Sequence, residues 1–330
     1  MGFKTKRFIV LMNMFILLFT MTAFAQHREM IKASGNYKTK EIKIKNFDQI
    51  KLLGSPTIIY TQSDNGKSEL KLVGSDNLLD LLECEVSNNT LIVKFESGVN
   101  IQFGRNGQLK VMASSPSLKN ILLQGSGDVI LNNSLKCTDL IMNLRGSGDI
   151  KAGTVVCTNS FSATLQGSGD IVVGDRLQSV KTALILQGSG DLDVHNLVAT
   201  STTASLQGSG DLKVKGASVS GVIDVLLQGS GDLNVERIQA NEVKAGLQGS
   251  GDMKLEGTTR QATLGLTSSG EIDAKNLSAT NVNAKLNGSG NITCFVSGIL
   301  NCSMSGSGEI GYKGNPSKIE STGKNKPKRL

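Results

Sequence analysis

The sequence predicts an all-β fold: a single-stranded, right-handed parallel β-helix, or β-solenoid, of about ten coils with about 20 residues each. Three observations predict it. A Gly-Ser-Gly-acidic motif recurs at nearly constant spacing, apolar and polar residues alternate within each repeat, and the composition combines 38 glycines with only 4% aromatic residues. Such a composition favours an aliphatic core packed in thin layers.

The repeat is the strongest of these signals. Seven copies of Gly-Ser-Gly-Asp begin at Gly125, Gly146, Gly167, Gly188, Gly208, Gly229 and Gly249. Degenerate copies follow at residues 268–271, 288–291 and 306–309, and neighbouring copies are 18 to 21 residues apart. This spacing matches one turn of a β-helix and is far shorter than the repeats of common helical arrays. Each repeat is therefore predicted to form one coil.

Within a repeat the pattern has the period of two that strands require. Leu165, Ile171 and Val173 share one side of the chain, whereas Ser168 and Asp170 share the other. The same phase recurs in the following repeats, so stacked coils are predicted to bury one continuous aliphatic column that no single coil could bury alone.

The two glycines of each motif fall on the apolar phase, as Gly167 and Gly169 illustrate. We expect them to point inward, where the chain bends or approaches the neighbouring wall and a side chain would not fit. Replacing Gly169 by Val is then expected to overpack the interior.

The first residues have the three parts of a secretory signal: basic residues at 4–7, an apolar run over 8–19, and small residues at Ala23 and Ala25. We predict a signal peptide over residues 1–25 and a flexible linker over 26–39. The apolar run is shorter than the roughly 20 residues that span a bilayer. The chain is therefore expected to be exported, to the periplasm, the outer surface or the medium, with no transmembrane segment after cleavage.

The rest of the chain divides into three parts. Residues 40–124 alternate irregularly and are predicted to form an N-terminal β cap with the first coils, fused to the solenoid of residues 125–312. Residues 313–330 are rich in lysine and are expected to be a basic, disordered tail. Removing the basic residues of the signal and the net +5 of the last twenty residues leaves a net charge of −1. The body thus lacks the positive charge of a nucleic-acid binder.

Five cysteines remain after cleavage, an odd number without dense spacing, so no disulfide framework is expected. Cys137 and Cys157 occupy the same place in successive repeats and are candidates for a disulfide between stacked coils. Neither a metal site nor a cofactor is predicted, because no His or further Cys lies near them in the sequence.

Stacking the repeats predicts two outward polar rows, named together the Ser–Asp row. Its members are Ser126, Ser147, Ser168, Ser189, Ser209, Ser230 and Ser250 with Asp128, Asp149, Asp170, Asp191, Asp211, Asp232 and Asp252. Carboxylates one coil apart repel by about 0.9 kcal/mol per pair in water, so Lys151, Lys213 and Lys254 are expected to compensate them. We expect each Asp to cap its own turn by accepting backbone N–H bonds. Calcium binding along the row is the alternative.

The motifs resemble a known family. The Phe47-x-x-Ile50 start, Gly54, the segment 77–79, the Gly-Ser-Gly-Asp coils and the closing Gly-Asn-Pro at 314–316 are similar to the bacterial family called putative auto-transporter adhesin, head GIN domain. The likeness covers nearly all of residues 40–320, although the literal Gly-Ile-Asn tripeptide is absent. The resemblance implies an exported β-helical protein and, more weakly, adhesion.

The function expected is therefore a non-enzymatic adhesion, surface-binding or structural module, in which the Ser–Asp row is the candidate ligand-binding surface for a glycan or a protein. The alternatives are a β-helix polysaccharide lyase or hydrolase and, third, a binder of a repetitive lattice such as ice. No catalytic residue is predicted, since His195, the one imidazole of the body, is expected at a solvated turn. A groove holding three or more convergent ionisable groups would favour the enzyme, and smooth uniform faces the adhesin.

Overall fold

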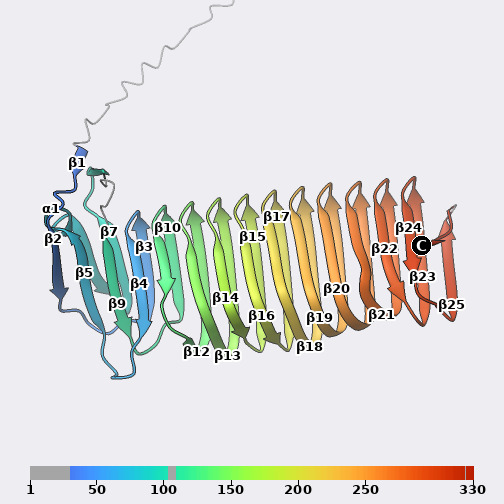
Figure 1. The fold of residues 1–330 in the computed structure, drawn as a ribbon, viewed down its shortest axis with the longest axis horizontal. Coiled ribbons are helices and arrows are strands. Elements are labelled where there is room, and N and C mark those ends of the chain that lie inside the picture. Colours follow the sequence, from blue (N-terminus) through green and yellow to red (C-terminus); the bar gives the residue numbers. More distant parts are fainter. Residues whose placement is uncertain (1–29, 103–108, 324) are drawn as a thin grey trace, which may run out of the picture.

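The computed structural model describes residues 30–102, 109–323 and 325–330. The predicted signal peptide and the first residues of the predicted linker, 26–29, lie outside the described residues. Parallel coils stacked side by side make up most of the described chain, with the N-terminal cap at one end (Figure 1). No helix in the described part of the chain has the length and apolar character needed to traverse a bilayer.

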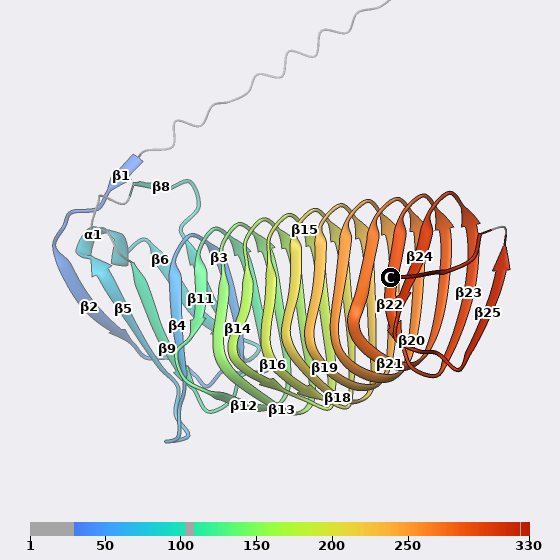
Figure 2. The ribbon, with the colours of Figure 1, turned by 45° about the vertical axis from the view of Figure 1, so that its right-hand side comes forward.

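The predicted β-solenoid is confirmed. Its strands are β10 (Asn120–Gly125), β11 (Asp128–Leu131), β12 (Leu135–Gly146), β13 (Ile150–Gly167), β14 (Ile171–Gln178), β15 (Lys181–Gly188), β16 (Leu192–Ala199), β17 (Ser201–Gly208), β18 (Asp211–Gly229), β19 (Asp232–Gly249), β20 (Asp252–Ser268), β21 (Glu271–Gly288), β22 (Asn291–Val296), β23 (Ile299–Gly306) and β24 (Glu309–Lys313). Each pairs in parallel with the equivalent strand of the next coil, so that Gly167 lies beside Gly188 and Gly188 beside Gly208. Figure 2 shows the same stack from a second direction.

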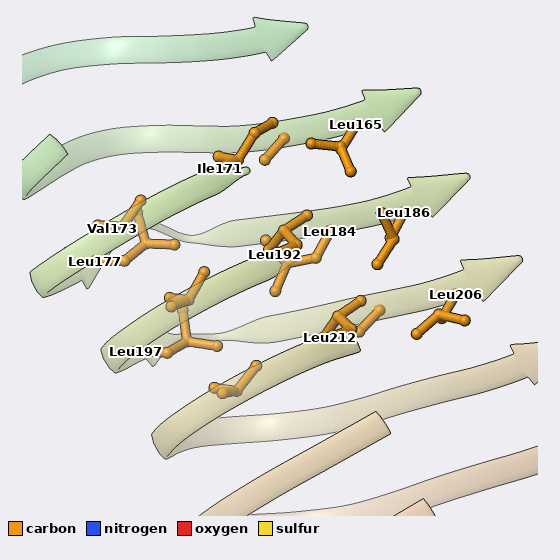
Figure 3. Packing of buried hydrophobic residues seen from close by; sticks show 14 of the residues in the cluster. Leu165, Ile171, Val173, Leu177, Leu184, Leu186, Leu192, Leu197, Leu206 and Leu212 are labelled. Carbon is orange, nitrogen blue, oxygen red and sulfur yellow. The ribbon is translucent and has the colours of Figure 1, made fainter. Parts of the chain in front are cut away.

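The core is the predicted aliphatic column. Leu165, Ile171 and Val173 are fully buried, and so are the residues in the same phase of the next coils. Figure 3 shows these side chains pointing into the space between the strands of a coil, each above its equivalent in the next coil. Burial of this column is the main favourable contribution to folding, at about 25 cal/mol per Å² of apolar surface.

The glycines of the motif lie where the chain approaches a neighbouring strand and no side chain would fit, as expected, but the approach runs along the stack and not toward the interior. A Cβ atom on Gly167 would lie 2.1 Å from the carbonyl oxygen of Gly146, and one on Gly169 would lie 1.8 Å from that of Gly148. Both positions therefore face the backbone of the preceding coil, along the axis of the stack. Glycine is required because the two coils approach too closely for any side chain.

The solenoid begins before the repeats that the sequence displays. The strands β3 (Gln49–Gly54) and β4 (Thr57–Gln62) pair in parallel with β10 and β11, which places Gly54 beside Gly125. They form a first coil whose corner holds Pro56 where later coils have glycine.

The cap covers the open end of this first coil. It contains β2 (Tyr37–Ile42), β5 (Glu69–Ser75), α1 (Asp76–Leu79), β6 (Leu82–Ser87), β7 (Thr90–Phe95) and β9 (Lys110–Ser115), with the separate pair β1 (Met30–Lys32) and β8 (Asn100–Gln102). β7 and β9 extend the coil in parallel, and the antiparallel strands β6, β5 and β2 then end the sheet. Residues 30–32 and 37–39, expected in the flexible linker, belong to β1 and β2.

The tail also differs from the expectation of disorder. Its strands β25 (Lys318–Gly323) and β26 (Lys328–Arg329) pair in parallel with β23 and β24. Every residue of β25 is exposed, so no apolar burial orders it. The open edge of the last coil offers unpaired backbone groups, and the tail satisfies them despite its polar composition.

Candidate functional site

The Ser–Asp row lies at the corner where each coil turns after its Gly-Ser-Gly sequence. The structure places its members in register, and late coils continue it with Glu271, Asn291 and Glu309. All seven serines are exposed. Within the described residues, their hydroxyl groups make no side-chain hydrogen bond with the rest of the protein.

The aspartates do not cap their own turns. The backbone N–H of Asp149 donates to Oδ1 of Asp128 at 3.1 Å, and that of Asp170 donates to Oδ1 of Asp149 at 3.1 Å. The pattern continues from Asp191 to Asp170 at 3.0 Å and from Asp211 to Asp191 at 3.2 Å. Each of these carboxylates therefore ties one coil to the next, and one of its oxygens is used in doing so.

Lysines compensate part of the negative charge. Lys151 contacts Asp149 at 2.7 Å and Lys213 contacts Asp211 at 2.7 Å, both through Oδ2. Hydrogen bonding to Asp149 raises the pKa of Lys151, and hydrogen bonding to Asp211 raises the pKa of Lys213. These partly exposed pairs contribute at most about 1 kcal/mol each.

Lys254, the third lysine expected to compensate the Ser–Asp row, pairs with another acid. Lys254 contacts Glu256 at 2.8 Å and not the aspartate of its own coil. Across the residues that the structure describes, no group of three or more His, Cys, Asp or Glu side chains is arranged to hold a metal ion. In the row the acids therefore stand as single groups, one per coil.

Cys137 and Cys157 lie beside one another in register, with their Sγ atoms 3.3 Å apart and both thiols free. The contact with Cys157 lowers the pKa of Cys137, and the contact with Cys137 raises the pKa of Cys157. In-register Cα atoms on neighbouring parallel strands are about 4.8 Å apart, within the range that a disulfide spans. The disulfide remains a prediction that this geometry permits.

A groove that the sequence did not predict lies at the next bend of the coils. It has a volume of about 510 Å³ and is lined by residues that include Asp175, Arg176 and Arg237. The groove therefore holds three ionisable groups, the smallest number that would favour an enzyme. Only one of them is a carboxylate, whereas glycoside hydrolysis uses two.

Left-handed backbone at one bend of successive coils builds this groove. Asn196 has φ 47°, Gly216 has φ 115° and Arg237 has φ 49°. The side chain of Asn196 donates to the carbonyl of Asp175 at 2.8 Å, and the guanidinium of Arg237 donates to the carbonyl of Lys215. A Cβ on Gly216 would lie 2.8 Å from Nη2 of Arg237. The absence of that atom lets the guanidinium lie against the preceding coil.

His195 lies in strand β16 and not at a turn. Its Nε2 is 3.3 Å from Oδ1 of Asp193 and 3.1 Å from Nζ of Lys215. Lys215 also contacts the other oxygen of Asp193 at 2.6 Å. The imidazole thus lies beside the Asp193–Lys215 ion pair on a strand face, and among the described residues it contacts no Ser or Cys nucleophile.

Comparison with known protein families agrees with the resemblance seen in the sequence motifs. A family model described as putative auto-transporter adhesin, head GIN domain, matches residues 46–219 and 211–316. No curated protein matches the chain.

This chain is also similar to several proteins of solved structure. A putative adhesin from Bacteroides fragilis is 25% identical, with 91% of this chain and 97% of that chain covered and a TM-score of 0.33. A putative adhesin from Parabacteroides merdae is 20% identical, with coverages of 92% and 99% and a TM-score of 0.38. A putative lipid binding protein from Parabacteroides distasonis is 23% identical, with coverages of 92% and 100% and a TM-score of 0.32.

Proposed function

Because the chain belongs to the family described as putative auto-transporter adhesin, head GIN domain, we propose that it is a non-enzymatic adhesion module. The family favours an exported or surface protein. The proposed contact surface is the Ser–Asp row, which would bind a glycan or a protein on another surface.

The observation that carries this proposal is the set of exposed hydroxyl groups without partners in the described protein. Seven serines in register span six coil spacings, or about 29 Å at about 4.8 Å each. Each hydroxyl can donate one hydrogen bond and accept two. A regular row of this kind suits a ligand that itself repeats, because many weak contacts then add through a high effective concentration.

The coil-to-coil bonds of the aspartates support the same reading. Since Oδ1 of Asp170 accepts the N–H of Asp191, the corner is held rigid before any ligand arrives. Rigid display lowers the entropy lost on binding. The row can therefore serve structure and contact together.

A matched pair of variants tests the proposal. The row variant carries Ser168→Ala, Ser189→Ala and Ser209→Ala, and the control carries Thr203→Ala, Thr263→Ala and Ser303→Ala at exposed positions on another face. Binding of the fluorescently labelled protein to mucin and to intact cell surfaces is measured for both. We expect the row variant to lose at least tenfold in affinity and the control less than twofold. Equal binding by both variants would contradict the proposal.

A second function is favoured by one observation, the presence of Asp175 together with Arg176 and Arg237 in the lining of the groove. A single base can remove the proton next to a sugar carboxylate while cations neutralise that carboxylate, which is the chemistry of a polysaccharide lyase. Incubation with oligogalacturonate, followed by the ultraviolet absorbance of the unsaturated product, tests this alternative. An adhesin leaves the substrate intact, whereas cleavage that is lost in Asp175→Asn would establish the enzyme.

A further inference from the structure

The two arginines of the groove have no acidic partner in the described protein. The guanidinium of Arg176 donates to Oε1 of Gln178 at 2.9 Å, and that of Arg237 donates to the carbonyl of Lys215. Neither of them forms an ion pair with a carboxylate among the described residues. A guanidinium has five donors, so each retains several for an external acceptor.

The spacing of the arginines suits an extended ligand. They lie three coils apart, because the bends of Arg176, Asn196, Gly216 and Arg237 follow one another along the stack. Three spacings correspond to about 14 Å between Cα atoms, and the Arg237 side chain reaches back by one coil. One carboxylate cannot bridge both guanidinium groups, but a chain with repeated carboxylates can.

The groove continues toward a second one of about 610 Å³. Val198, Ser218 and Gln239 line both, and the second is bordered by the hydroxyl-bearing Thr158 and Thr200. A ligand held at the arginines can therefore extend along hydroxyl and amide groups. Saccharide hydroxyls are complementary to such groups.

We propose that this groove binds a saccharide chain that carries carboxylate groups, with Arg176 and Arg237 as the bidentate anchors. Arginine matches the planar carboxylate in geometry as well as in charge. The Ser–Asp row lies at the preceding corner and has acidic groups that repel such a ligand, so the two surfaces select different partners. This inference goes beyond adhesion through the row and can fail separately from it.

Carboxylates on a sugar come from two sources, uronate polymers and terminal sialic acid. A spacing of several coils favours the polymer, because a terminal sialic acid presents a single carboxylate. Oligogalacturonate, sialyllactose and neutral galactan oligosaccharides are therefore the three probes, with affinity measured by calorimetry at low and high salt.

The groove variant combines Arg176→Gln with Arg237→Asn, because Asn already occupies the equivalent left-handed position at 196. Its control combines Arg145→Gln with Arg260→Gln, which remove the same charge from exposed positions outside this groove. We expect oligogalacturonate to bind most tightly, to weaken with salt, and to lose at least tenfold in affinity in the groove variant only.

Four outcomes would overturn the inference. The first is equal loss in the control, the second is tighter binding of neutral galactan, the third is no binding of either acidic probe, and the fourth is tighter binding of sialyllactose than of oligogalacturonate. If the second or the third occurs while the protein still adheres to mucin through the row, adhesion stands and only the groove assignment fails. Tighter binding of sialyllactose than of oligogalacturonate would replace the polymer by a terminal sugar and refute the two-anchor geometry.

Discussion

Substituting Gly169 by Ala tests how the coils are stacked. The added Cβ would lie 1.8 Å from the carbonyl oxygen of Gly148, whereas ordinary contacts begin at 3.4 Å. The two coils would have to separate by about 1.6 Å at this corner, which is the difference of those distances. This is about a third of the normal coil spacing of about 4.8 Å.

Such a separation breaks the hydrogen bonds of the corner. The N–H groups of Ser168 and Gly169 donate to the carbonyl of Gly146 at 2.9 and 3.2 Å, and the N–H of Asp170 donates to the carboxylate of the preceding coil at 3.1 Å. Three bonds at about 1 kcal/mol each, with about 1 kcal/mol or more of steric strain, predict a loss of about 4 kcal/mol in the free energy of unfolding.

The matched control is Gly174→Ala in the same coil. Its added Cβ would have as its nearest atom the carbonyl oxygen of Ala152 at 3.9 Å, an ordinary contact. We expect its stability to stay within about 1 kcal/mol of the original protein. Urea denaturation followed by circular dichroism compares the midpoints of both variants, because a stacked repeat fold need not unfold in two states. Equal midpoints for Gly169→Ala and Gly174→Ala would refute the close stacking.

Further predictions concern the Asp side chains and the thiols. Asp170→Asn keeps the acceptor for the next coil and should leave stability unchanged or slightly raised, whereas Asp170→Ala should cost about 1 kcal/mol in urea denaturation. Calcium or a chelator should leave the melting temperature unchanged, and a chelator-induced fall of many degrees that Asp170→Asn abolishes would make the row an ion site. Mild oxidation by a disulfide reagent should join Cys137 to Cys157, and labelling of both thiols in the unfolded, unreduced protein would show that they only stack. The hydroxyl of Ser160 holds the pKa of Asp139 below its usual range. The stabilisation by this hydrogen bond is therefore present above about pH 3.9 and is lost as the pH falls further. Ser160→Ala should weaken this loss of stability at low pH in pH titrations of stability.

The sequence was sufficient to predict the coil and its core. Alternation assigns each residue to the inner or outer side, which is why Leu165 and Ile171 could be placed in the core and Ser168 on the surface. Alternation contains no information about direction along the stack. The contacts of Gly169 and Asp170 with neighbouring coils run in that direction, so the inward direction expected for Gly169 and the own-turn cap expected for Asp170 were wrong.

The groove could not be predicted because it depends on irregular bends. The register between β14 and β16 shifts after Val173, and the left-handed residues that follow bring Arg176 and Arg237 to one surface. The two arginines are far apart in the sequence and occur in no motif. Their only visible signal is that a large basic residue stands at a bend where neighbouring coils have Asn or Gly.

The two ends of the solenoid were predicted incompletely for a different reason. The first coil retains only Gly54 and Ser55 of the motif. The sequence therefore predicted first coils within residues 40–124, but it did not fix their strands, which the pairing of Gly54 with Gly125 shows. At the other end, β25 is ordered by backbone pairing to an open edge, which composition does not reveal.

The most direct test of the Ser–Asp row as the contact surface is a footprint of the adhering protein. Ser189→Cys and Thr203→Cys place single exposed thiols on the row and on another face of neighbouring coils. Their alkylation rates are measured by peptide mass spectrometry, in solution and on the surface to which the protein adheres. We predict at least tenfold slower alkylation at position 189 on the surface and an unchanged rate at position 203. Protection at 203 with free reaction at 189 would contradict it.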